Sequence, residues 1–458
     1  MQKEKLKKFT AFVRSMIPHE AAYLKLRLNT KDDERQLIMN HVFHNVMNTE
    51  QFTPFDIEID KRKYSKLLTW MQVELDKIDV DKNLKWISKT HESILLDEIS
   101  PALDAQIMRS IKRYSPHEYY FLRFYEMLIE YRHYLLIRMR YNGHQKINEF
   151  LEKHHFDYQR SKLVYDQMHQ ATSDIIGTGN TLQKEAIQWK RWLYDSYKDS
   201  TLDGLNRYMA AIRYIFVCLR YNSMDDLEDI LLSLDSFFKN GSNYSKRILV
   251  NYYDNMLVLF DKKGDYEKAK YYGYLSIKHQ HPDAIIYRNN LVNVLIKNQE
   301  FDEALNVIEE AEFKTKSTRN FHSVIGFVSN HVRCLTKVGR VSEAVTKGRV
   351  FLNAYDNNIL KYRWHRFFAA YHGALLTAGK HHEIIKNTEK YDLAQKEWVN
   401  YNKKHSQKIL NIYYQIALHQ SPKEQSAAFR EIMNQLITPD QTSQYDTELL
   451  EIIEEMSV

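Results

Sequence analysis

The segment Gly264-Asp265-Tyr266-Glu267-Lys268-Ala269 decides the fold class of this chain, because looser copies of it recur downstream. The copies are Gln299-Glu300-Phe301-Asp302-Glu303-Ala304 and Gly339-Arg340-Val341-Ser342-Glu343-Ala344. Each copy opens with Gly or Gln in a polar turn, has an aromatic residue or Val two places later, and ends with a small Ala. This order predicts a chain reversal followed by a helix that approaches its neighbour closely at the Ala.

The residues that precede each copy align as well. The aligned segments are 250–269, 285–304 and 325–344, and apolar side chains at helical spacing fill the first part of each one. An amphipathic helix, a polar turn and a second helix with a small residue at the crossing make a helical hairpin. The sequence therefore predicts repeated hairpins, which are clearest over residues 250–351.

This unit resembles the tetratricopeptide repeat (TPR), in which two helices fill about 34 residues. The spacing departs from that length, with 35 residues from Ala269 to Ala304 and 40 from Ala304 to Ala344. Weaker copies near 224–227 and 379–384 have Leu227 and Ile384 in place of the Ala. The resemblance implies an all-α fold, a right-handed superhelical stack of degenerate TPR-like hairpins (an α-solenoid).

We expect three parts along the chain. Residues 1–110 have amphipathic helices without a repeat period and are expected to form an N-terminal helical bundle. Residues 111–437 are expected to form the TPR-like repeat domain. Residues 438–458 are expected to form an acidic C-terminal segment with a short helix.

Several short motifs predict where helices begin and end. Breaks are expected near Asn29–Asp33, Thr53-Pro54 and Ser100-Pro101, and at Gly177-Thr178-Gly179-Asn180-Thr181. The segments Ser115-Pro116-His117-Glu118 and Ser421-Pro422-Lys423-Glu424 predict helix starts, since Ser caps a helix and Pro suits its first position.

Composition favours the same fold class. The chain has 12 Gly and 7 Pro among 458 residues, below the average usage of roughly 7% and 5%. Sheet hairpins and the phosphate loops of nucleotide-binding α/β proteins use these residues, whereas helices joined by short polar loops use few. The two cysteines, Cys218 and Cys334, lie inside apolar helical patterns, which predicts small buried side chains in a reducing cytoplasm.

No targeting or membrane-spanning segment is expected. The apolar residues near the N-terminus are interrupted by Arg14, too early for a signal peptide. No uncharged apolar run approaches the ~20 residues of a membrane span. We therefore expect a cytoplasmic protein without a membrane partner.

Charge is unevenly distributed. The formal net charge is +6, yet the segment from Ile437 to the C-terminus holds six acidic residues and no Lys or Arg, so the remainder carries +12. A basic body attracts acidic protein segments or nucleic acid, and it is equally typical of a Lys-rich solvated helical surface.

Motifs for bond chemistry are missing from the sequence. It contains no P-loop, HExxH, CxxC or Gly-x-Ser-x-Gly pattern, and its twenty histidines are poorly clustered. We therefore predict a protein that is not an enzyme, with no catalytic residue, no cofactor and no metal site.

A repeated pair of polar residues marks a candidate binding face. The sixth position of each aligned segment is Asn and the thirteenth is Lys, and seven residues span about two helical turns, so both share one face. The resemblance implies that this first helix lines the concave surface, where Asn and Lys bind a peptide's backbone and carboxylates. Asn and Lys are also common at these positions in TPR repeats generally, so the match supports the fold more than a ligand. The candidate partner-binding residues are Asn255, Lys262, Asn290, Asn293, Lys297, Asn330, Arg333 and Lys337.

Two functions follow as hypotheses. The first is a non-catalytic protein–protein interaction scaffold or adaptor that holds an acidic or extended partner segment on the concave face. The alternative is a nucleic-acid-associated or ligand-sensing regulatory helical-repeat protein. It would use the stretch from Arg109 to Arg140, where Arg and Tyr interleave as in surfaces that grip phosphates and stack on bases.

Overall fold

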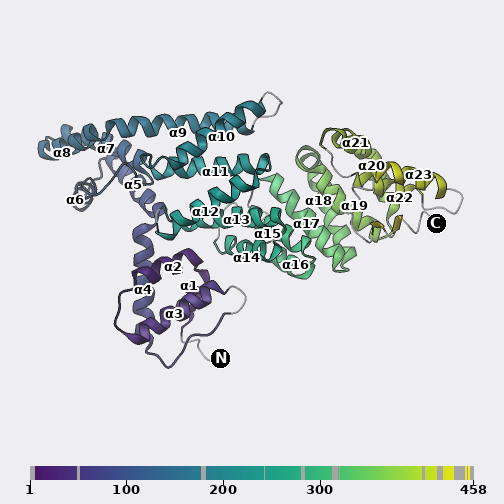
Figure 1. Cartoon of the computed structure of the whole chain (residues 1–458), viewed down its shortest axis with the longest axis horizontal. Helices are drawn as coiled ribbons and strands as arrows, with labels where there is room; N and C mark the ends of the chain where they lie inside the picture. Colours follow the sequence, from purple (N-terminus) through teal and green to yellow (C-terminus); the bar gives the residue numbers. More distant parts are fainter. Residues whose placement is uncertain are drawn as a thin grey trace. The chain divides into compact units, whose positions relative to one another are not determined.

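A computed structural model of the chain describes residues 6–48, 52–176, 182–241, 243–279, 284–311, 318, 320–404, 408–419, 426–437, 449–450 and 452–453. Within these ranges the chain forms 23 α-helices and no β-strand (Figure 1). The predicted all-α class is therefore confirmed.

The chain divides into two compact units. The first comprises Met1–Lys263 and Tyr274–His279, and the second comprises Gly264–Gly273 and Gln280–Val458. The domain boundaries expected at residues 110 and 437 stay predictions.

Helices begin and end near the predicted breaks in the N-terminal region. The loop between α2 and α3 covers Asn29, residues 52–60 are not helical, and Ser100 caps α6 by accepting a hydrogen bond from the Leu103 N–H at 3.2 Å. The helices of this region are α1 (Lys7–Ser15), α2 (Pro18–Arg27), α3 (Asp33–Met47), α4 (Lys61–Ile78), α5 (Val80–Leu95) and α6 (Pro101–Ser110).

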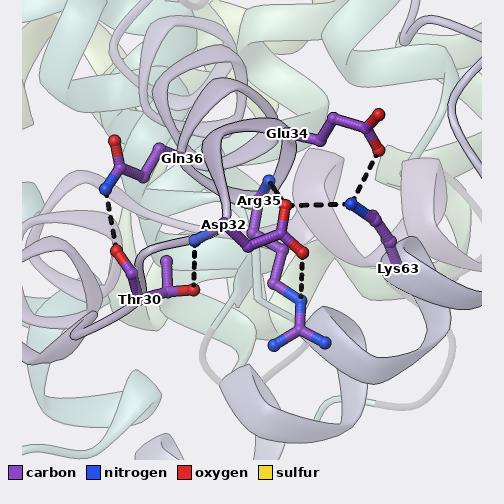
Figure 2. Close-up of polar contacts among 6 residues, drawn as sticks. All are labelled: Thr30, Asp32, Glu34, Arg35, Gln36 and Lys63. Carbon is purple, nitrogen blue, oxygen red and sulfur yellow. Dashed lines mark hydrogen bonds and ion pairs between the residues drawn. The ribbon is translucent and has the colours of Figure 1, made fainter.

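Asp32 ties the start of α3 to the start of α4 (Figure 2). Its carboxylate caps α3 by accepting from the Arg35 N–H at 3.3 Å and also accepts from Lys63 Nζ at 2.9 Å. Lys63 pairs with Glu34 at 2.8 Å as well, so this cation lies between two carboxylates. The hydrogen bond from Lys63 lowers the pKa of Asp32, and the hydrogen bond to Glu34 raises the pKa of Lys63.

The remaining helices of the first unit follow in order. They are α7 (Phe121–Ile137), α8 (Tyr141–Lys153), α9 (His155–Ile176), α10 (Leu182–Lys198), α11 (Gly204–Arg220), α12 (Met224–Lys239) and α13 (Lys246–Lys263). The glycine-containing break predicted at residues 177–181 lies outside the described residues, between the last residue of α9 and the first of α10.

One predicted helix start is wrong. Residues 111–120 form turns, and α7 begins at Phe121 instead of Pro116. The Ser115 hydroxyl accepts from the N–H of His117 at 3.3 Å, which makes a local turn instead of a helix cap. The turns bury Tyr119 and Tyr120, which are 2% and 6% exposed, so burial of this aromatic pair prevails over the capping signal.

The N-terminal helices pack directly against α12 and α13. His19 of α2 lies between Tyr253 and Asp235, with Nδ1 at 2.6 Å from the Tyr253 hydroxyl and Nε2 at 2.9 Å from Asp235 Oδ1. Next to it, the buried Glu20 accepts from the Tyr244 hydroxyl at 2.6 Å. These buried contacts join residues separated by more than 200 positions in the sequence.

The second unit continues the alternation of helix and short turn. Within it α15 contacts α17 and α17 contacts α19, so these alternate helices lie side by side (Figure 1), and α22 contacts both α19 and α20. Its helices, the first of which crosses the boundary between the units, are α14 (Tyr266–Ser276), α15 (Ala284–Lys297), α16 (Phe301–Glu309), α17 (Phe321–Lys337), α18 (Val341–Tyr362), α19 (Trp364–Thr377), α20 (His381–Tyr391), α21 (Leu393–Lys404), α22 (Ile409–Leu418) and α23 (Ser426–Leu436).

A residue with left-handed backbone precedes the second helix of five consecutive helix pairs. These residues and their φ angles are Asn222 (55°), Gly264 (78°), Gln299 (61°), Gly339 (80°) and Gly379 (67°). Gly at this position is favoured because it has no Cβ to strain the turn. Five residues later in each pair lies a side chain with no exposed surface, namely Leu227, Ala269, Ala304, Ala344 and Ile384. The turns expected from the repeated motif are therefore the places where successive helices meet.

The C-terminal segment is described only in part. The helix start predicted at Ser421 and most of the acidic segment 438–458 lie outside the described residues. Leu449 and Ile453 are buried in one apolar cluster with Phe429 and Met433.

Candidate functional site

Arg366 of α19 joins the candidate residues of α15 and α17 into one network. Its Nη2 donates to Oδ1 of Asn330 at 2.7 Å and also to Oδ1 of Asn293. Asn330 Nδ2 donates to Oδ1 of Asn293 at 3.1 Å. Three neighbouring helices thus each contribute one side chain to a continuous set of hydrogen bonds.

Burial explains why asparagines occupy this position. Asn330 is 3% exposed and Asn289, which lies one turn before Asn293, is 7% exposed. The Asn289 amide donates to the Ser323 carbonyl at 2.9 Å. The half-buried guanidinium of Arg366 requires acceptors, and amide carbonyl oxygens supply them without adding a charge.

Further positive charge gathers around Arg366. Burial first, and then the charges of Arg363 and Arg333, lower the pKa of Arg366 to about 10. Burial also lowers the pKa of Arg363. Arg363 Nε donates to Nε2 of His322 at 2.9 Å, and partial burial followed by the two arginine charges lowers the pKa of His322.

Six of the eight predicted binding residues lie in the second unit. Lys297 and Arg333 are exposed, while Asn290, Asn293 and Lys337 are half-buried. The buried Asn330 is placed to act through Arg366 instead of touching a partner itself.

The other two predicted residues lie in the first unit, on α13. Asn255 is half-buried and its Nδ2 donates to the Asn251 carbonyl at 2.9 Å, within the same helix. Lys262 is exposed near the end of α13. Asn255 therefore makes a contact within its own helix, whereas Asn293 and Asn330 make contacts between helices.

Sequence reasoning missed Asn289, His322, Arg363 and Arg366. Arg366 falls outside the repeated sixth and thirteenth positions, so the alignment gave no reason to select it. A usable signal was present, however. Residues 357–382 contain four Lys or Arg and no Asp or Glu, which indicates cations without carboxylates nearby in sequence.

The alternative stretch from Arg109 to Arg140 uses its aromatic residues for packing. Tyr119, Tyr120, Tyr125, Tyr131 and Tyr134 are all at most 8% exposed. Three of its arginines pair with acids, namely Arg123 with Glu126 at 2.9 Å, Arg140 with Asp104 at 3.1 Å, and Arg138 with Asp97. Buried rings offer no platform on which bases stack.

A separate apolar groove of about 810 Å³ lies between α17 and α18. Phe321, Val324 and Val328 line it from α17, and Val350 and Phe351 line it from α18. Helical spacing places these α17 residues on a different side from Asn330 and Arg333. The groove and the arginine network are therefore two distinct surfaces of one helix.

Both cysteines lie in the protein interior. Cys218 and Cys334 are free and fully buried, and burial raises the pKa of their thiols to about 11 and about 12, which keeps them protonated and unreactive. Among the described residues, no set of three His, Cys, Asp or Glu side chains is arranged to bind a metal ion. None of the described helices has the length and apolar composition needed to span a membrane.

Comparison of the chain with known protein families, with curated proteins and with solved structures gives no match.

Proposed function

We propose that the chain is a non-catalytic interaction module that binds an acidic or extended segment of another protein on the face formed by α15, α17 and α19. The observation that carries the proposal is the set of hydrogen bonds in which Asn293 and Asn330 hold Arg366 between the three helices. A guanidinium fixed in this way binds a carboxylate at low cost in side-chain entropy.

The arrangement of the helices supports a TPR-like interpretation of this face. Three pairs, α15–α16, α17–α18 and α19–α20, follow one another, and in each pair the second helix is preceded by a residue with left-handed backbone. In the proposed right-handed superhelical stack, the first helix of each pair lines the binding surface. A surface of this kind suits an extended peptide because successive repeats present equivalent positions along it.

The chemistry of the face favours recognition by charge and shape. Lys297 and Arg333 are exposed, and Arg366 lies deeper among amide groups. Arg binds carboxylates through two parallel N–H donors, and peripheral cations speed the approach of an acidic partner. Binding of this type needs no bond to be made or broken.

Photo-crosslinking tests the location of the partner. A benzophenone amino acid is placed at Lys297 or Arg333, and for control at Lys386, which is exposed on α20. Each full-length chain is irradiated in an extract of its source cells. The proposal predicts one shared protein adduct from positions 297 and 333 that is missing from position 386. Adducts from position 386 alone, or nucleic-acid adducts from 297 and 333, would contradict it.

A further inference from the structure

Arginines of the second unit differ in how their charge is balanced. Arg340 pairs with Glu309 at 2.9 Å and with Glu343 at 2.7 Å, and Arg349 pairs with Glu383 at 2.6 Å. Arg363 and Arg366 differ, since their polar contacts within the described residues are only to the ring nitrogen of His322 and the amide oxygens of Asn293 and Asn330. Their two positive charges are thus held in place by neutral acceptors.

Such an arrangement costs free energy in the absence of an anion. Burial penalises the charged form of each arginine, and the two charges repel each other, as the lowered pKa of Arg366 reflects. An anion placed between them would add an attractive interaction with each arginine, and these two attractions outweigh the repulsion between the arginines. The protein therefore holds two cations in an arrangement that a bound anion would stabilise.

Gly326 provides the space for one of these cations. A Cβ atom at position 326 would lie 2.9 Å from Nη1 of Arg363, closer than real contacts of this kind. The guanidinium consequently lies directly against the α17 backbone at a position that any larger residue would disturb. Backbone, glycine and His322 together fix Arg363 in the same way that the asparagines fix Arg366.

We infer that Arg363 and Arg366 form a site for a tetrahedral oxyanion, either the phosphoryl group of a partner's side chain or free inorganic phosphate. The inference rests on the proposed function and specifies what the face recognises. Two guanidinium groups offer paired N–H donors to several oxygens at once, and a dianion balances both charges whereas a carboxylate balances one. Exposed Arg333 adds positive charge next to them.

Calorimetric titration of the full chain with inorganic phosphate, sulfate and acetate tests the site. We expect saturable binding of phosphate and sulfate, with acetate weaker. The double variant Arg363→Gln/Arg366→Gln is expected to bind phosphate at least about tenfold more weakly, since each lost charge-assisted contact is worth more than the 1.4 kcal/mol of a tenfold change. Arg349→Gln, which also removes an arginine charge, is expected to bind within about twofold of wild type. Equal affinity in the wild type and the double variant would overturn the inference, as would absence of saturable phosphate binding.

A second variant covers the case in which loss of both arginines unfolds the unit. Gly326→Ala keeps every charge but pushes the Arg363 guanidinium aside, so a folded Gly326→Ala chain is expected to bind phosphate several-fold more weakly. Unchanged phosphate affinity in that folded chain would contradict the site. Circular dichroism melting establishes folding for each variant.

Two further comparisons separate the sources and the proposals. Tighter binding of N-acetyl-phosphoserine amide than of inorganic phosphate would identify a partner's phosphorylated side chain, and the reverse order would identify the free ion. Crosslinks from positions 297 and 333 without phosphate binding would support the proposed interaction module and contradict the proposed oxyanion site. Phosphate binding without those crosslinks would support the proposed oxyanion site and contradict the proposal of a protein partner on this face.

Discussion

The guanidinium of Arg366 donates a hydrogen bond of 2.7 Å to the side-chain carbonyl of Asn330, which joins α19 to α17 through a cation and an uncharged acceptor. A carboxylate at that position would neutralise the arginine, whereas the amide only orients it. The positive charge therefore stays available to a ligand. The paired Arg349 and Glu383 of the same unit illustrate the other arrangement, in which the charge is already balanced.

Replacing the neutral acceptor Asn330 by a charged one is expected to leave the chain more stable than the matching alanine variant and to remove its response to phosphate. In Asn330→Asp the carboxylate pairs with Arg366, and this charge-assisted hydrogen bond adds roughly 1 kcal/mol over a neutral one, which offsets the loss of the Asn330 Nδ2 donor to Asn293 Oδ1. Urea unfolding followed by circular dichroism, with and without phosphate, measures both effects. Asn330→Ala serves as the comparison, because it leaves Arg366 short of an acceptor and is expected to destabilise. If Asn330→Asp is as unstable as Asn330→Ala, the charge of Arg366 is already balanced in the wild type, which would contradict the account.

Removing the buried carboxylate of Glu397 is expected to destabilise the second unit strongly. Glu397 has no exposed surface and accepts from the backbone N–H groups of Leu410 and Asn411 at 3.0 and 2.8 Å and from Nε2 of His365 at 2.7 Å. It therefore caps α22 and ties it to α19. Glu397→Ala is expected to lower the free energy of unfolding by roughly 3 kcal/mol in urea melts. The exposed Glu389→Ala is expected to change it by less than about 0.5 kcal/mol, so equal losses would refute the capping role.

A single methyl group at Gly348 is expected to disrupt the packing of α18 on α19. A Cβ atom there would clash with Cδ2 of Tyr371, whose side chain is 1% exposed and cannot move aside freely. Gly348→Ala is expected to cost roughly 1–3 kcal/mol of unfolding free energy. Because the clash needs both residues, the double variant Gly348→Ala/Tyr371→Leu is expected to lose less unfolding free energy than the two single variants lose together. Additive losses in thermal melts would mean that the two residues do not clash.

The buried ring of His372 is expected to make stability depend on pH. His372 has no exposed surface, neither ring nitrogen has a hydrogen-bond partner among the described residues, and burial lowers its pKa from 6.5 to about 3. Between pH 6.5 and 3 the unfolded chain binds a proton at this residue that the folded chain does not. Wild-type stability therefore falls as pH falls through that window, by up to about 1.4 kcal/mol per unit from this residue.

The variant His372→Phe removes this contribution and is expected to show a shallower decline from pH 6.5 downward. Urea midpoints at several pH values give the comparison, with exposed His382→Phe as the control. Parallel pH profiles for wild type and His372→Phe would exclude a neutral buried imidazole.

The sequence predicted the turns between helices better than the side-chain contacts between them. Turns at Gly264, Gly339 and Gly379 follow from local chemistry, because glycine suits the left-handed backbone that a tight reversal requires. Likewise, buried Ala304 and Ala344 follow from helical spacing and the need for close approach. These features depend on residues close in sequence, which is why the pattern alone revealed them.

Features that depend on distant residues were missed. Arg366 joins Asn293 across 73 positions, and no repeat register relates those two residues. The helix expected at Ser115 was wrong for a related reason, since burial of Tyr119 and Tyr120 decided the backbone there. Local signals specify where helices turn, and packing specifies which side chains then meet.

Hydrogen–deuterium exchange of the full chain, alone and with its crosslinked partner protein, tests the central claim most directly. If the partner lies on the face formed by α15, α17 and α19, amide exchange should slow in Ala284–Lys297, Phe321–Lys337 and Trp364–Thr377. Slowing in α17 and α18 without α15 and α19 would place the partner in the apolar groove instead. That result, or slowing confined to the first unit, would contradict the proposed binding face.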